Sequence, residues 1–190
     1  SSRGQVYWLK VYEVPQGSRI SKGKPIVNLF PIMPGEKINA ILAVKDFVED
    51  QYIFMATSKG TVKKTPLSDF SNPRKSGIIA IKLDNGDFLI GASVTNGSND
   101  IVLVSNGGKA VWFDESAVRS MGRNARGVRG MKLADKQQVL SLLVSFSDSE
   151  SVLVATENGY GKRTQLSEFR RSSRGTQGVK AIQVSDRNGI

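Results

Sequence analysis

The chain contains neither cysteine nor histidine among its 190 residues. The absence of cysteine excludes disulfides, thiolate metal sites and cysteine nucleophiles, and it is typical of the reducing cytoplasm. The absence of histidine removes both the commonest general base and the commonest zinc ligand. No apolar run approaches the roughly 18 residues that a membrane-spanning helix needs. These absences favour a non-catalytic cytoplasmic protein without a membrane segment and without a cofactor of its own.

Negative charge is also scarce. Lys and Arg number 27 against 17 Asp and Glu, which leaves a net charge of +10. Hydrophobic residues make up 39% of the chain and glycine contributes 19 residues, as in an ordinary globular protein of one domain over residues 1–190. A positive surplus of this size points to a polyanionic partner, nucleic acid first and an anionic membrane surface second.

Paired glycines recur along the chain and divide it into four similar units. The pairs are Gly4 and Gly23, Gly60 and Gly77, Gly108 and Gly127, and Gly159 and Gly178. Within a pair the glycines are 17 or 19 residues apart, and the first glycines are 56, 48 and 51 residues apart. We therefore expect four repeats, over roughly 1–48, 49–97, 98–146 and 147–190.

The residues around the glycines have the composition of β-strands. Apolar runs such as IFMATSKG, IVLVSNGG and VLVATENG end at the first glycine, in turn-forming residues. The segments VYWLKVY, TVKKT, AVWF and YGKRT follow it and are predicted as second strands. Helical periodicity is weak, and residues 114–120 could hold about two turns. The predicted fold is all-β and propeller-like, a β-pinwheel with about four blades of four strands each.

The positive surplus is concentrated between the two glycines of each pair. These segments hold 16 positive and 5 negative residues, a net +11, whereas the rest of the chain carries −1. If blades surround an axis, equivalent segments share one rim, and a basic rim suits the phosphate backbone of a bent duplex. The candidate phosphate contacts are Lys63, Lys64, Arg74, Lys75, Arg119, Arg123, Arg126, Lys162, Arg163, Arg170, Arg171 and Arg174.

The sequence contains no intact catalytic motif and no intact phosphate-binding loop. GSRISKGKP at 17–25 has its second glycine one position late and Pro25 where Ser or Thr would hold Mg²⁺.

Trp8 and Trp112 share one register, in which the other repeats have Lys64 and Arg163, and this mixture predicts a half-exposed strand face. A simpler interpretation of the charge is that surface Lys and Arg keep a β-protein soluble and block edge pairing.

The stretches SSRGQVYWLKVYEVP, FMATSKGTVKKTPLSDF, VRGMKL and TENGYGKRTQLSEF resemble the carboxy-terminal domain of the bacterial DNA gyrase A protein. The resemblance covers essentially all of the chain. It implies a β-pinwheel whose blades exchange strands and whose basic rim wraps double-stranded DNA, so that the holoenzyme introduces negative supercoils. It further implies an A2B2 assembly with the gyrase A core and the gyrase B subunit, a nucleoid-associated location, and ATP and Mg²⁺ used elsewhere in that assembly.

The family's wrapping box, Gln-Arg-Arg-Gly-Gly-x-Gly, has no intact match. Degenerate versions of it are the loops NPRKSG at 72–77, GRNARG at 122–127 and RSSRGTQG at 171–178. The family pattern also leads us to expect a fragment that lacks the first and last blades of the usual six.

Two other functions remain open from the sequence. One is a propeller scaffold that binds acidic protein partners on its basic rim. The other is the corresponding domain of the topoisomerase IV A protein. An enzymatic propeller would need convergent acids or histidines in a central channel, and the acids here are scattered over turns.

Overall fold

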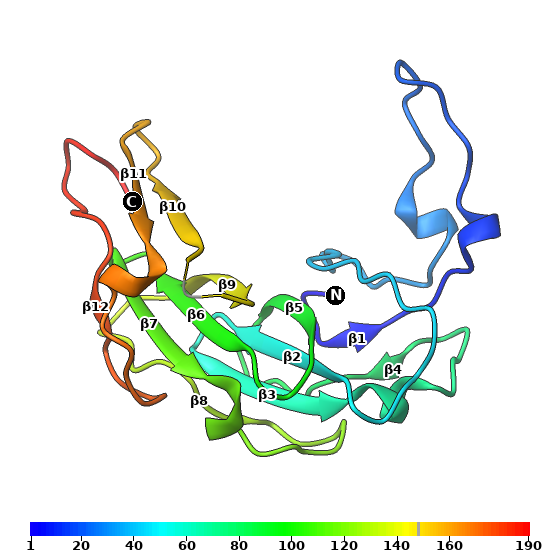
Figure 1. Ribbon diagram of the computed structural model, residues 1–190. Helices are drawn as coiled ribbons and strands as arrows, with labels where there is room; N and C mark the ends of the chain where they lie inside the picture. The colour runs from blue at the N-terminus through cyan, green and yellow to red at the C-terminus, as the bar shows by residue number, and fades with distance from the viewer. Residues whose placement is uncertain (148) are drawn as a thin grey trace.

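The computed structural model describes residues 1–147 and 149–190, and within them it is built from short antiparallel strands (Figure 1). The strands are β1 (Gln5–Val6), β2 (Tyr52–Thr57), β3 (Thr61–Pro66), β4 (Ile78–Ile79), β5 (Leu89–Thr95), β6 (Asp100–Ser105), β7 (Lys109–Asp114), β8 (Val128–Arg129), β9 (Val139–Ser145), β10 (Ser151–Ala155), β11 (Gly161–Gln165) and β12 (Val179–Lys180). Single 3₁₀ turns are η1 (Val11–Glu13), η2 (Ile26–Asn28), η3 (Leu67–Phe70), η4 (Glu115–Ala117) and η5 (Leu166–Glu168). The all-β prediction is confirmed, and the candidate helix at 114–120 is reduced to η4.

In three of the four sheets, one edge strand comes from the following repeat. Two sheets have four strands, in the orders β5-β2-β3-β8 and β9-β6-β7-β12, and two have the pairs β1-β4 and β10-β11. The residue after each second glycine pairs at the same place in the preceding repeat: Val6 with Ile78, Val62 with Val128, and Ala110 with Val179. The strand exchange expected of a β-pinwheel is therefore present at three successive junctions.

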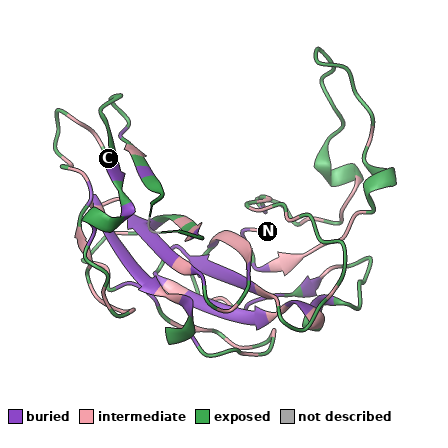
Figure 2. Cartoon of the chain, in the orientation of Figure 1, coloured by how far each residue is buried: buried purple, intermediate pink, exposed green. Residues whose placement is uncertain are grey.

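The first repeat does not form the four-stranded blade that its sequence predicts. Of the expected strand VYWLKVY only Val6 lies in β1, and Val11 and Tyr12 are 88% and 84% exposed in η1 (Figure 2). In the other repeats this strand pairs with the apolar run that precedes the first glycine. Only three residues precede Gly4, so the described chain contains no such partner strand. Four strands per blade hold for two of the four sheets.

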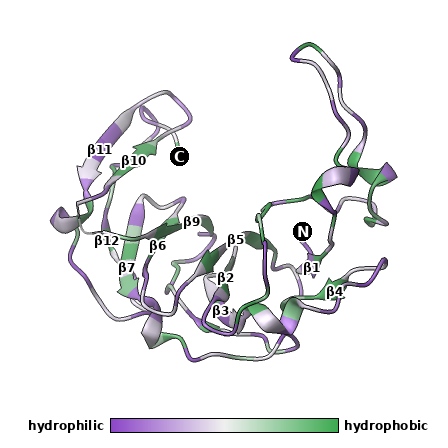
Figure 3. Cartoon of the chain, turned by 45° about the vertical axis from the view of Figure 1, so that its right-hand side comes forward, coloured by the Kyte–Doolittle hydropathy of each residue, from purple (hydrophilic) through white to green (hydrophobic). Residues whose placement is uncertain are grey.

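The blades stand side by side in an open arc (Figure 3). Phe54 of β2 and Phe113 of β7 belong to one buried cluster that joins the two four-stranded sheets, with ring centroids 6.5 Å apart. The inner strands β5 and β9 contact each other on the concave side of the arc, and the exchanged strands β4, β8 and β12 lie on its convex side (Figure 1). The exchanged strands therefore define the outer edge.

In the first three pairs, the first glycine is a junction between repeats. Gly4, Gly60 and Gly108 have φ of +71°, +81° and +68°, a region that L side chains rarely adopt. The carbonyl of Gly60 accepts hydrogen bonds from Gly130 N at 2.8 Å and Met131 N at 3.1 Å, and those of Gly4 and Gly108 accept the equivalent pairs. The glycine spacing seen in the sequence is thus the spacing of inter-repeat contacts.

Candidate nucleic-acid interface

The basic loops predicted from the sequence lead directly into the exchanged strands. Loop 72–77 precedes β4, loop 122–127 precedes β8, and loop 171–178 precedes β12. Because the three strands pair in the same register with three successive blades, their loops occupy equivalent places along the outer edge. Eight of the twelve candidate cations are exposed: Arg74, Lys75, Arg119, Arg126, Lys162, Arg163, Arg170 and Arg171.

Lys63 and Lys64 were predicted to contact phosphate, and the structure contradicts this. Lys63 has 0% exposure, and its Nζ donates to the carbonyl oxygens of Ala80 at 2.6 Å and of Arg123. Lys64 is 7% exposed, donates to the carbonyl of Glu115 at 3.2 Å, and places its Nζ 5.1 Å from the Tyr52 ring centroid. Both ammonium groups are held inside the protein, so they cannot reach a ligand on its surface.

Arg171 is exposed but bound by acidic neighbours. One of its guanidinium nitrogens, Nη2, contacts a carboxylate oxygen of Asp100 and lies 3.2 Å from Asp114 Oδ2. Hydrogen bonds from Ser116, and then the Arg171 charge, lower the pKa of Asp114, so this carboxylate is ionised at neutral pH. The guanidinium also lies over Trp112, which is 6% exposed, so the half-exposed face predicted at that position is wrong.

Arg123 and Arg174 hold one repeat against the preceding one. Both stand four residues before a second glycine, and both are half-buried. Arg123 Nη1 donates to the carbonyl of Ile79 at 3.4 Å, and Arg174 Nη1 donates to the equivalent carbonyl of Arg129 at 3.1 Å. Each guanidinium retains further N–H groups that can face a phosphate.

Arg126 forms an ion pair with Asp84, with Nη1 and Oδ1 3.1 Å apart. Both side chains are well exposed, at 65% and 58%, so the pair contributes little and can exchange for a phosphate. Arg126 therefore remains a candidate contact.

Two exposed cations of the outer edge were missed from the sequence. Arg129 lies on β8 and Lys180 on β12, each two residues after a second glycine. They lie outside the segments between paired glycines, in which the positive surplus of the sequence is concentrated. The sequence feature that could have identified them is their shared position, two residues after the second glycine of their repeat.

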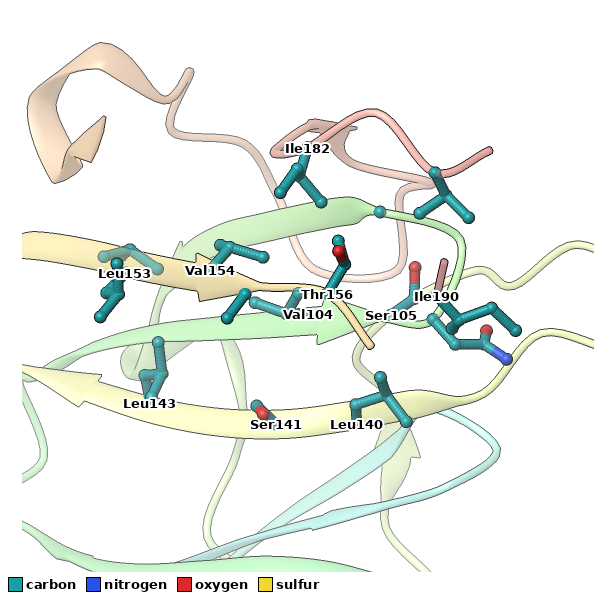
Figure 4. Close-up of a pocket in the computed structure, with 15 residues that line it drawn as sticks. Val104, Ser105, Leu140, Ser141, Leu143, Leu153, Val154, Thr156, Ile182 and Ile190 are labelled. Atoms are coloured by element: carbon teal, nitrogen blue, oxygen red, sulfur yellow. The ribbon is translucent and has the colours of Figure 1, made fainter. Parts of the chain in front are cut away.

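The pockets of the described chain differ sharply in chemistry. One, where β10 meets β6 and β9, is lined by aliphatic side chains such as Leu140, Leu143 and Val154 with a few hydroxyls and one amide, and no charged side chain lines it (Figure 4). A second hollow, beside β12, is lined by Arg170 and Arg171, by the Asp114 carboxylate and by neighbouring Ser and Thr side chains. Of these two, the second is the one with cationic side chains that suit an anion.

Two kinds of feature are absent from the described residues. No cluster of three or more acidic side chains has the geometry to hold a metal ion there. Nor does any helix in that part of the chain have the length and apolar character needed to cross a membrane.

Comparison with known proteins places the chain among the gyrases. The family described as "DNA gyrase C-terminal domain, beta-propeller" matches residues 1–45, 51–96, 99–145 and 150–189. The DNA gyrase A protein of Salmonella typhimurium is 52% identical over 189 residues, and that of Escherichia coli is 50% identical over 190 residues. Both alignments cover the whole of this chain but only 21% and 22% of the relative, so the chain spans about a fifth of the length of these proteins.

Solved structures agree on the architecture. The C-terminal domain of DNA topoisomerase IV superposes with a TM-score of 0.90 at 33% identity, over 99% of this chain and 58% of that one. The DNA gyrase A C-terminal domain superposes with a TM-score of 0.83 at 28% identity, over 99% and 60%. With strand exchange, glycine register and basic outer loops in place, the chain belongs to the DNA gyrase C-terminal domain family.

Proposed function

We propose that this chain binds double-stranded DNA along its outer edge and bends the duplex around it, as a wrapping module of a gyrase A protein. One observation carries the proposal: exposed cations recur on the loops before β4, β8 and β12, and two of the exchanged strands, β8 and β12, carry one as well. Contacts at such places bind phosphates and carry no base readout, so binding is tolerant of sequence.

The curvature of the arc gives these contacts a use. Bending a duplex smoothly costs on the order of 1–6 kcal/mol over 20–30 base pairs. A single basic patch gains nothing from bent DNA, whereas cations on successive blades are reached together only if the duplex follows the outer edge (Figure 1). Removing Lys63 and Lys64 from the candidate set leaves this argument intact, because the loops before β4, β8 and β12 keep exposed cations without them.

The wider assembly belongs to the same proposal. The module would act beside a gyrase A core and the gyrase B subunit in an A2B2 complex on cytoplasmic, nucleoid-associated DNA. The module itself would be non-catalytic, and ATP and Mg²⁺ would be used in other parts of that complex. The support is the family membership and the high identity to gyrase A proteins over this segment.

The salt dependence of duplex binding tests the proposal. The logarithm of the binding constant should fall linearly with the logarithm of salt concentration, with a slope of about −0.9 per phosphate neutralised. Replacing Arg119 and Arg170 by Gln should make the slope shallower by roughly two units, whereas Lys136→Gln, a control in the turn before the inner strand β9, should leave it unchanged.

A flat salt dependence would contradict DNA binding by this edge. Retention of an acidic protein partner after nuclease treatment, together with no shift of duplex DNA, would favour the scaffold function instead.

A further inference from the structure

Lys63 occupies a place that no other described lysine shares. It lies on β3, between Val62 and Lys64, and its ammonium group is fully buried. One of its hydrogen bonds goes to Ala80, just after β4, and the other goes to Arg123, in the loop before β8. A single nitrogen therefore joins three segments at the boundary between two blades.

We propose that Lys63 is a positioning residue, which fixes the basic loop 122–127 on the outer edge from inside the protein. The loop has three other attachments to the same side of the boundary. They are the hydrogen bond from Arg123 Nη1 to the carbonyl of Ile79 at 3.4 Å, the one from Lys82 N to the carbonyl of Ala125 at 3.3 Å, and the ion pair of Arg126 with Asp84. All three are long or exposed. The buried ammonium supplies the attachment that water does not compete with.

The electrostatics of the site fit a positioning role. Burial lowers the pKa of Lys63 to about 8; the Asp69 carboxylate opposes this shift and the Arg123 guanidinium adds to it. With a pKa of about 8 the amine is mainly charged at neutral pH, so it can donate to both carbonyl oxygens, and it is too enclosed to meet DNA itself.

The other repeats show that this attachment is specific to one boundary. The third residue after the first glycine is Tyr7, Lys63, Val111 or Lys162. Where it is Val111, the loop reaches back with its own cation: Arg174 Nε donates to Ala117 at 2.8 Å, beside its bond to Arg129. Lys162 is exposed, so it is a matched control at the same repeat position.

The absence of cysteine allows a chemical test. In Lys63→Cys, alkylation in denaturant followed by refolding gives either an S-aminoethyl side chain, which restores the amine, or an S-propyl chain of equal length without it. We expect the backbone amides of residues 124–127 to exchange with solvent at least about tenfold faster with S-propyl than with S-aminoethyl. The same pair of adducts at Lys162→Cys should leave exchange unchanged. Equal protection of the loop by both Lys63 adducts would overturn the proposal.

A measurement on the unmodified chain covers the case in which the S-propyl protein does not refold. At pH 6, with ¹⁵N and ¹³C labels, a coupling through the hydrogen bond should join Lys63 Nζ to the carbonyl carbon of Arg123. An assigned Lys63 ammonium signal without that coupling would contradict the positioning role.

The relevance of this loop to DNA rests on the proposed function, and duplex titration of the two adducts tests it separately. Weaker binding by the S-propyl protein supports both ideas. A loosened loop with unchanged binding keeps the role of Lys63 and removes this loop from the DNA interface.

Discussion

At the scale of single residues, the lysines of TVKKT show why charge alone is a poor guide to exposure. Charged residues are almost never buried without partners, so the sequence favours a surface position for Lys63 and Lys64. In the structure the four consecutive residues 62–65 are all buried, because neighbouring blades cover both faces of β3. Strand alternation predicts one buried face, and nothing in a single repeat signals that the second face is covered by another.

The burial of Lys63 predicts a pH dependence of stability. Its pKa is about 8 in the folded chain, against roughly 10.4 for an unfolded lysine. Between these values the unfolded state binds more protons, so the free energy of unfolding rises with pH, by at most about 1.4 kcal/mol per pH unit. Lys63→Met lacks this term. Denaturant unfolding from pH 7.5 to 10 should therefore show the parent gaining stability relative to the variant, and parallel pH curves would contradict the burial.

The junction glycines predict a matched pair of effects. A Cβ on Gly108 would overlap the carbonyl oxygen of Ile182, whereas one on Gly159 would meet nothing within 4 Å. Both have positive φ, which costs Ala about 1–2 kcal/mol at either site. Gly108→Ala should thus destabilise the chain by about 2 kcal/mol more than Gly159→Ala, measured as unfolding free energy. Equal losses of unfolding free energy in the two variants would show that the backbone around Gly108 relaxes to accept the added Cβ.

At the scale of elements, the exchanged strand explains what the sequence could and could not show. In three repeats the exchanged strand is preceded by a basic loop and a glycine, and it begins with an apolar residue. Its existence and its register were therefore predictable from the sequence. Its partner was not predictable from the strand pattern, because that pattern is equally satisfied by pairing within a repeat or with the preceding one; the exchange was expected only from the family resemblance. The same gap hid Arg129 and Lys180, which are on the outer edge only because β8 and β12 pair with the previous blade.

The acidic clamp on Arg171 predicts a gain of DNA affinity on mutation. Asp114→Asn keeps the side-chain oxygen that accepts from Ser116 N but removes one charge held against Arg171. Duplex affinity should rise about two- to fivefold, the range of a partly exposed ion pair. Asp135→Asn, on an exposed turn, makes the same change in net charge and is the control. An equal rise in both would show that only net charge matters.

At the scale of the whole molecule, repeat count and fold class were readable from periodicity, whereas the state of the first repeat was not. VYWLKVY has the composition of a strand, yet a strand forms only beside a partner, and the described residues provide none for most of this segment. Composition predicts what a segment can form, and neighbouring segments decide whether it does.

The arc predicts a change in DNA topology as well as binding. Nicked circles ligated with the chain present should have a shifted linking number, because a duplex that follows the edge along a handed, non-planar path stores writhe. The shift should disappear at salt concentrations that abolish binding. Bound circles with an unshifted linking number would show that the duplex is not wrapped along such a path.

Strand exchange has a consequence for how such a chain can change in length. The unit that repeats in the sequence is out of step with the unit that folds, because every sheet of four is completed by residues of the next period. Excising one whole period would join a blade to the completing strand of a later one and leave all remaining sheets intact. A chain that ends at a period boundary instead leaves its last sheet without the completing strand, and so with an open β-edge. We therefore expect genes of this kind to gain and lose blades by insertion or deletion of full periods.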